Sequence, residues 1–151
     1  MIILSIDSGI ERTGYAVFDG KNYLESALIK TSKELPTEKR LEKIYFSLKK
    51  IVEKYNPGLV VMEQLFFFRN QKTAVMVSQA QGVALLLAAQ NQMKTKFLTP
   101  LQIKQTITGY GQADKKAVQK MIKIETGLDI KQDDEADAVA CGLAYSIINK
   151  L

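Results

Sequence analysis

Apolar and polar residues alternate along the chain in two ways, first at strand spacing and then at helix spacing. Ile2 to Ile6 is a short apolar run, and Gly14 to Phe18 is a second. Tyr23 to Ile29 follows, and the Asp19-Gly20 pair that precedes it is typical of a hairpin turn. We therefore expect three strands at the start, the last two joined as a hairpin.

A helix is expected from about Thr37 to Tyr55, because apolar residues recur there at helical spacing. The sequence Asn56-Pro57-Gly58 ends this helix. The next apolar run, Leu59 to Met62, suits a short strand buried on both faces, and Glu63 follows it.

The rest of the chain predicts mainly helices. We expect a long helix over 70–92, a short strand over 96–99, and a short helix that begins at Pro100. Two further helices are expected, over 113–126 and from Asp133 to about Asn149. Five strands, the later ones alternating with helices, predict an α/β fold with a mixed sheet and helices on both faces.

Length and composition suit one globular domain over residues 1–151, since 46% of the chain is hydrophobic and 25% is charged. The longest uninterrupted apolar run, Val83 to Ala89, is far shorter than the roughly 20 residues of a membrane span, so we expect no membrane contact. The single Cys141 and the lack of a signal peptide indicate the reducing cytoplasm.

Charge and residue types narrow the chemistry. The net charge of +5 fits nucleic-acid binding, and it fits an ordinary soluble surface equally well. The chain has no histidine, which excludes Ser-His-Asp and Cys-His catalysis and a His-ligated zinc site. Acid–base or metal chemistry must therefore use carboxylates, lysines, tyrosines or Cys141.

Asp7 and Glu63 each follow a predicted buried strand. If these strands are parallel neighbours, their C-terminal ends meet at one edge of the sheet and the two side chains lie side by side. Adjacent carboxylates repel each other unless a cation compensates. The alternatives are that Asp7 caps the Ser8-Gly9 loop and that Glu63 pairs with Arg69 or a lysine.

Asp134 and Asp137 are one helical turn apart near the start of the last predicted helix, so they share a face. The same stripe continues through Cys141, Ala144 and Ile148, which predicts that it faces inward. Asp133 and Asp134 have an alternative role as acids that complement the helix dipole.

Together the four carboxylates favour a shared cation site. Hard oxygen ligands suit Mg²⁺ or Mn²⁺. Two such ions, roughly 4 Å apart, can activate a water and stabilise the leaving oxygen in phosphodiester cleavage. This chemistry requires no histidine.

Five segments, in order along nearly the whole chain, resemble the motifs of one family. They are Ile2–Gly9 with Thr13-Gly14-Tyr15, Val60–Phe66, Gln79–Val83, Lys104–Gly111 with Lys115, and Asp134–Ala140. As a set they are similar to the RuvC-type resolvases, which cut Holliday junctions. The chain departs from the family pattern at Ser8, where proline is common, at Gln81, where a basic residue is common, and in its short C-terminal tail.

The resemblance implies an RNase H-like fold and a homodimer that pairs through the helix over 70–92, although its small residues have the alternative of packing on the sheet. It implies two Mg²⁺ ions per active site, with Mn²⁺ as an alternative, held by Asp7, Glu63, Asp134 and Asp137 as catalytic ligands. The dimer would nick two strands of four-way junction DNA symmetrically, in cooperation with a branch-migration motor.

The resemblance also assigns basic and aromatic residues. Lys104 and Lys115 would hold the scissile phosphate or stabilise charge that develops there, unless they are merely solvated lysines. Phe66 would stack on bases at the junction, with core packing as the alternative. Further predicted contacts to DNA come from Arg69, Lys72 and Lys116, and these charges otherwise form a solvated face.

Three rival functions fit part of the pattern. A sugar-kinase-like or actin-like ATPase shares the opening strand and hairpin. Such an ATPase needs two domains of this kind and a second glycine-rich phosphate loop, whereas this sequence has room for one domain and shows no such loop. A non-catalytic module that binds branched nucleic acid would not need the complete acidic set. An RNase H-like nuclease acting on RNA or RNA–DNA hybrids fits the first motif, whereas the segment from Lys104 to Lys115 favours junction DNA.

Overall fold

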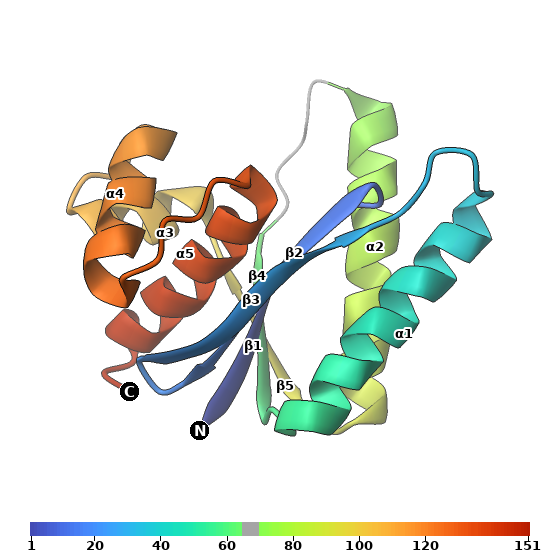
Figure 1. Ribbon diagram of the computed structural model, residues 1–151, viewed down its shortest axis with the longest axis horizontal. Helices are drawn as coiled ribbons and strands as arrows, with labels where there is room; N and C mark the ends of the chain where they lie inside the picture. The colour runs from blue at the N-terminus through green and yellow to red at the C-terminus, as the bar shows by residue number, and fades with distance from the viewer. Residues whose placement is uncertain (65–69) are drawn as a thin grey trace.

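A mixed five-stranded sheet separates two helical layers (Figure 1). The computed structural model describes residues 1–64 and 70–151. The strand order is β3-β2-β1-β4-β5, in which β1, β4 and β5 are parallel and β2 and β3 are antiparallel to their neighbours. The strands are β1 (Ile2–Asp7), β2 (Arg12–Asp19), β3 (Asn22–Lys30), β4 (Leu59–Glu63) and β5 (Lys94–Leu98).

Each face of the sheet carries its own helices. Helices α1 (Thr37–Tyr55) and α2 (Gln71–Gln90) cover one face, and α3 (Pro100–Thr108), α4 (Lys115–Thr126) and α5 (Asp133–Ile148) cover the other. Because side chains alternate along a strand, Ile3 packs with the α5 layer and Leu4 with the α1 and α2 layer. The predicted mixed α/β sheet with helices on both faces is confirmed.

Helix α5 lies unusually close to the centre of the sheet. The buried Ser5 hydroxyl on β1 donates to the Ala138 carbonyl at 2.7 Å. Gly142 faces the same strands, and a Cβ there would come within 2.5 Å of the Phe18 ring. Small residues on α5 therefore let its N-terminal acids approach the ends of the strands.

Several predicted bounds shift in the structure. The helix expected over 113–126 begins at Lys115, because the Asp114 side chain caps it by accepting from the Ala117 N–H at 2.8 Å. The strand expected over 96–99 runs from Lys94 to Leu98. Its residues are mostly exposed at the edge of the sheet, so its sequence has no apolar run that marks its bounds. Ile148 is 46% exposed rather than inward, because the last turn of α5 extends past the sheet, where residues 149–151 are exposed too.

Helix α2 has an apolar surface that the described residues do not cover. Ala80, Ala84, Leu87 and Ala88 are buried, whereas Val75 and Leu86 are 57% and 55% exposed. By length and composition alone this helix is able to cross a membrane. A helix packed on a sheet passes the same test, and the expectation of no membrane contact stays a prediction.

Candidate active site

Asp7 and Glu63 end adjacent parallel strands at the centre of the sheet. The register pairs Ile6 on β1 with Met62 on β4, so the next residue on each strand is one of the two acids. Both line a cavity of 320 Å³, together with Asp134 and Asp137. The structure thus brings all four predicted carboxylates to one cavity.

Glycine at position 14 allows the start of α5 to meet the sheet beside Asp7. Gly14 on β2 pairs with Asp7 on β1. A Cβ on Gly14 would lie 1.9 Å from the Asp134 carbonyl oxygen, so no larger residue fits here without a shift of α5. Glu135 adds a second anchor, because its carboxylate accepts from the Ser26 hydroxyl at 2.5 Å.

The shared cavity disfavours negative charge. Burial raises the pKa of Asp7 to about 8, and the nearby carboxylates of Asp137, Asp134 and Glu63 contribute to the rise. Burial likewise raises the pKa of Glu63, with Asp137 adding to it, and raises the pKa of Asp137. Such a cluster needs a compensating cation to hold all its charges at neutral pH.

Two basic side chains already partner these acids. Arg12 Nε lies 3.2 Å from Asp134 Oδ2, and Lys115 Nζ lies 4.0 Å from Asp137 Oδ2 and 3.3 Å from Asp133 Oδ2. Burial lowers the pKa of Lys115, but the charges of Asp137 and Asp133 outweigh it and the net direction is upward. These pairs are largely exposed, so each is weak and easily exchanged.

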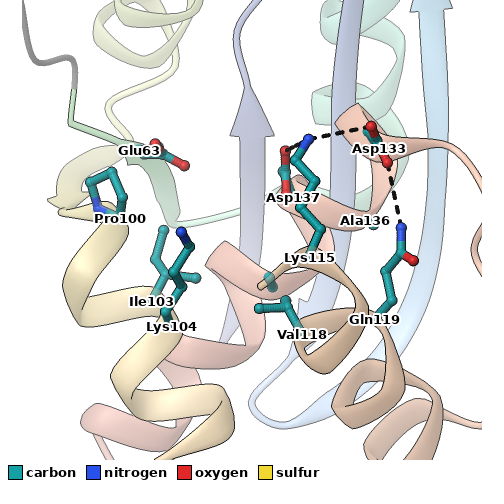
Figure 2. A pocket seen from close by; sticks show the side chains of 11 residues that line it. Glu63, Pro100, Ile103, Lys104, Lys115, Val118, Gln119, Asp133, Ala136 and Asp137 are labelled. Carbon is teal, nitrogen blue, oxygen red and sulfur yellow. Dashed lines mark hydrogen bonds and ion pairs between the residues drawn. The ribbon is translucent and has the colours of Figure 1, made fainter. Parts of the chain in front are cut away.

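An adjoining cavity has a volume of 180 Å³. Figure 2 shows lysines on opposite sides of it. Lys104 from α3 lies beside Glu63, and Lys115 from α4 lies beside Asp137. The predicted pair of active-site lysines is therefore placed next to the acids. Lys72 and Lys116 are exposed and line neither cavity, while Phe66 and Arg69 lie outside the described residues.

The donor set fits a hard divalent cation. All four acids offer oxygen ligands, and the buried Ser8 hydroxyl beside Asp7 has no hydrogen-bond partner among the described residues. As the side chains stand, no group of three or more acidic or cysteine residues in the described part of the chain is arranged to hold an ion. Asp134 and Asp137 face Arg12 and Lys115 instead, so metal binding requires these two acids to turn.

Three residues that contact the site were not predicted from the sequence to do so. Arg12 pairs with an acid far along the chain, and no local pattern marks such a contact. Gln81, which departs from the family pattern, donates from Nε2 to the Glu63 carbonyl at 3.2 Å and so holds the end of β4. Asp133, expected only to complement the helix dipole, also pairs with Lys115.

A mixed sheet of this order, with carboxylates gathered at the ends of its two central parallel strands, places the chain in the RNase H-like class of nucleases. The sequence model of the family "Crossover junction endodeoxyribonuclease RuvC" matches residues 3–145. The chain belongs to this family and is an endodeoxyribonuclease.

Relatives and solved structures agree over nearly the full length. The RuvC protein of Alkaliphilus metalliredigens (strain QYMF) is 43% identical over 152 residues, which cover 97% of this chain and 93% of that protein. The structure of T. thermophilus RuvC in complex with Holliday junction substrate has a TM-score of 0.92 and 28% identity, covering 99% of this chain and 95% of that one. A second Thermus thermophilus RuvC structure has a TM-score of 0.89 and 28% identity, covering 99% and 96%. The predicted family and fold are confirmed.

Proposed function

We propose that this protein resolves four-way (Holliday) DNA junctions by metal-dependent hydrolysis of one phosphodiester bond in each of two strands. The observation that carries the proposal is the gathering of Asp7, Glu63, Asp134 and Asp137 on one cavity. Membership of the RuvC family, and the junction substrate bound by the T. thermophilus relative, support four-way junctions as the substrate.

The four carboxylates would hold two Mg²⁺ ions, with Mn²⁺ as the alternative. When bound, the ions supply an activated water and stabilise the leaving oxygen. Burial and the neighbouring acids raise the pKa of Asp7 to about 8, so this carboxylate has a strong need for a counter-charge. Asp7 would therefore be a ligand of the catalytic cations.

The lysines act on the phosphate rather than on the metal. Lys104 and Lys115 lie on opposite sides of the cavity that adjoins Glu63 and Asp137. We assign them to hold the scissile phosphate and to neutralise charge that develops on it. Ile103 and Val118 add apolar wall to this cavity, and a lower local dielectric would strengthen these charge interactions.

Paired nicks require two active sites, and α2 offers a surface for pairing. Val75, Gly82 and Leu86 are exposed along it, and a Cβ on Gly82 would meet no atom within 4 Å. Among the small residues of this helix, Ala88 packs in the core, whereas Ser78, Gly82 and Ala89 are exposed. We propose that two copies of the chain pair through α2.

The remaining assignments come from the sequence or from the family resemblance and stay predictions. They are phosphate contacts by Lys72 and Lys116, contacts by Phe66 and Arg69, a single domain over residues 1–151, the cytoplasm as the compartment, and cooperation with a branch-migration motor.

The decisive experiment is cleavage of a synthetic mobile four-way junction in Mg²⁺ and in EDTA. A linear duplex of the same sequence and an RNA–DNA hybrid are tested beside it. We expect paired symmetric nicks on the junction alone, lost in EDTA. Asp7→Asn should abolish nicking and leave junction binding intact, whereas Asp19→Asn, at the far end of the hairpin, should nick normally.

Two results would contradict the proposal in different ways. Preferential cleavage of the hybrid would assign the site to RNA. Tight binding of the junction without cleavage in Mg²⁺ or Mn²⁺ would leave a non-catalytic binding module.

A further inference from the structure

Arg40 is a buried cation in the first turns of α1. Its side chain is only 7% exposed, and its Nη2 atom has no hydrogen-bond partner among the described residues. Within residues 1–64 and 70–151 it takes part in no ion pair. Burial of a guanidinium without a carboxylate partner costs stability, so its retention calls for another purpose.

The guanidinium instead supports a short relay of hydrogen bonds. Arg40 Nε donates to Thr31 Oγ1 at 2.8 Å, and the Thr31 hydroxyl donates to the Ile10 carbonyl at 2.5 Å. Thr31 is itself 6% exposed. A charged donor polarises the hydroxyl that it contacts, and bonds linked in this way strengthen one another in a buried setting.

The relay ends in the turn that directly follows Asp7. Residues 8–11 form this turn between β1 and β2. Its successive carbonyls are each held by a threonine: Gly9 by the Thr13 hydroxyl at 2.6 Å, Ile10 by the Thr31 hydroxyl, and Glu11 by the Thr31 N–H at 3.0 Å.

The turn is also locked by packing. Ile10 is 4% exposed and lies in the core with α1 and α2. A Cβ on Gly9 would lie 2.4 Å from the Arg12 carbonyl, so the backbone there is as close as glycine permits. Asp7, Ser8 and Gly9 line the acidic cavity, so whatever fixes this turn also fixes the position of the Asp7 carboxylate.

We infer that Arg40 and Thr31 are positioning residues of the nuclease, which hold the 8–11 turn so that Asp7 stays among the other carboxylates. The inference rests on the proposed function, because it takes Asp7 to be a ligand of the catalytic cation. Neither residue touches the cavity; both act through the Ile10 carbonyl. The relay keeps Asp7 in place against the repulsion of three neighbouring acids.

The test compares four variants of the full chain. Thr31→Val removes the hydroxyl and keeps the shape, whereas Thr31→Ser keeps the hydroxyl. Arg40→Met removes the buried charge. Ser146→Ala is the matched control, because this hydroxyl is also buried but bonds to the Gly20 and Gly142 carbonyls, away from the 8–11 turn.

Two quantities are measured for each variant. The first is the rise in melting temperature that Mg²⁺ produces without DNA, since a ligand that binds only the folded state raises it. The second is the single-turnover nicking rate at saturating junction, titrated with Mg²⁺. Loss of a residue that orients a metal ligand lowers metal affinity or activity about 10-fold to 100-fold.

We expect Thr31→Val and Arg40→Met to lose most of the Mg²⁺-induced rise and to nick about 10-fold or more slowly. Thr31→Ser should resemble the wild type. Ser146→Ala should lose stability and keep both the full Mg²⁺ response and the nicking rate. Arg40→Met should fold even if Thr31→Val does not, because it removes a buried charge that lacks an acidic partner.

The inference is overturned if Thr31→Val and Arg40→Met behave like Ser146→Ala, with altered stability and a normal Mg²⁺ response. Asp7→Asn separates this result from failure of the proposed function. If Asp7→Asn loses the Mg²⁺ response and the relay variants keep it, only the relay is wrong. If Asp7→Asn itself responds to Mg²⁺ and nicks, the proposed function fails and the relay falls with it.

Discussion

The surroundings of Asp7 disfavour the negative charge of its carboxylate. It is buried at the end of a central strand, and three other carboxylates share its cavity. The charged Asp7 side chain therefore makes the folded protein less stable than an uncharged side chain would. That loss of stability suits a residue selected to bind a cation.

The disfavoured charge of Asp7 makes the stability of the protein depend on pH. The pKa of Asp7 is about 8 in the folded protein against an ordinary value of 3.8. A carboxyl group whose pKa is raised in the folded state contributes its full stability below its ordinary pKa. This contribution is lost as the pH rises through the pKa of the folded state. Without divalent cations, Asp7→Asn should therefore melt above the wild type, with a gap that widens from about pH 4 to about pH 8.

Thermal denaturation in EDTA across this pH range measures the gap. A 1 kcal/mol gain would raise the melting temperature by about 2–4 °C at this chain length. Addition of Mg²⁺ should narrow or reverse this gap in melting temperature, because only the wild type offers the cation all four carboxylates. A gap that stays constant with pH would show that the Asp7 carboxyl does not titrate in this window.

Lys115 and its neighbour Lys116 provide a matched pair at the same scale. Both side chains are exposed, but Lys115 lines the cavity beside Asp137, whereas Lys116 lies outside both cavities. Lys115→Ala should slow nicking by about 10²-fold at saturating Mg²⁺, since we assign this cation to stabilise charge on the scissile phosphate. Lys116→Ala should weaken junction binding modestly and leave the single-turnover rate unchanged. Equal effects of both variants would mean that Lys115 serves only as a surface charge.

At the level of elements, the contact between α5 and β2 assembles the site. Gly14→Ala places a Cβ 1.9 Å from the Asp134 carbonyl oxygen, so α5 must move away from the sheet. We expect a loss of about 1–3 kcal/mol, as for other overpacked sites, together with loss of nicking. Gly58→Ala is the control, because a Cβ there meets no atom within 4 Å and its effect should stay within about 0.5 kcal/mol.

Urea denaturation and the nicking assay together test this contact. If Gly14→Ala nicks at the wild-type rate, then the approach of α5 to β2 does not set the position of Asp134.

Element bounds were predictable where local signals are strong. The helix expected from Thr37 to Tyr55 has those bounds in the structure, and Asn56 adopts the left-handed conformation that ends it. Bounds were less predictable where packing decides them. Lys94 belongs to β5 because its N–H donates to the Gly58 carbonyl of the neighbouring segment, a contact that no local pattern indicates.

At the scale of the whole molecule, the proposed pairing of two copies through the exposed apolar face of α2 would bring two active sites together. Leu86→Lys should convert a dimer into a monomer, because a charge at this face opposes its burial against a second copy. The melting temperature of the monomer should fall only by the amount that pairing contributes. The monomer should nick the two strands independently. Light scattering after size-exclusion chromatography measures the mass, and the two strands of the junction are labelled separately.

Ile124→Lys is the control for this surface, since Ile124 is 63% exposed on α4, in the opposite helical layer. It should leave the mass and the pairing of nicks unchanged. A dimer that survives Leu86→Lys together with Val75→Lys would exclude α2 as the interface.

The sequence by itself determined the α/β class, the run of elements and the set of four acids. Strand and helix periodicities are local properties, and the chemistry of a hard cation limits the residue types to carboxylates when histidine is absent. The motif order then identified the family, which the comparisons confirmed.

Only the tertiary structure decided how those acids are supported. The ion pair of Arg12 with Asp134, the bond from Gln81 to the Glu63 carbonyl, and the relay from Arg40 through Thr31 each join separate elements. Such contacts depend on how helices pack on the sheet and on which rotamers that packing permits. No periodicity in the chain encodes them, because each partner is chosen by proximity in space rather than by spacing in sequence.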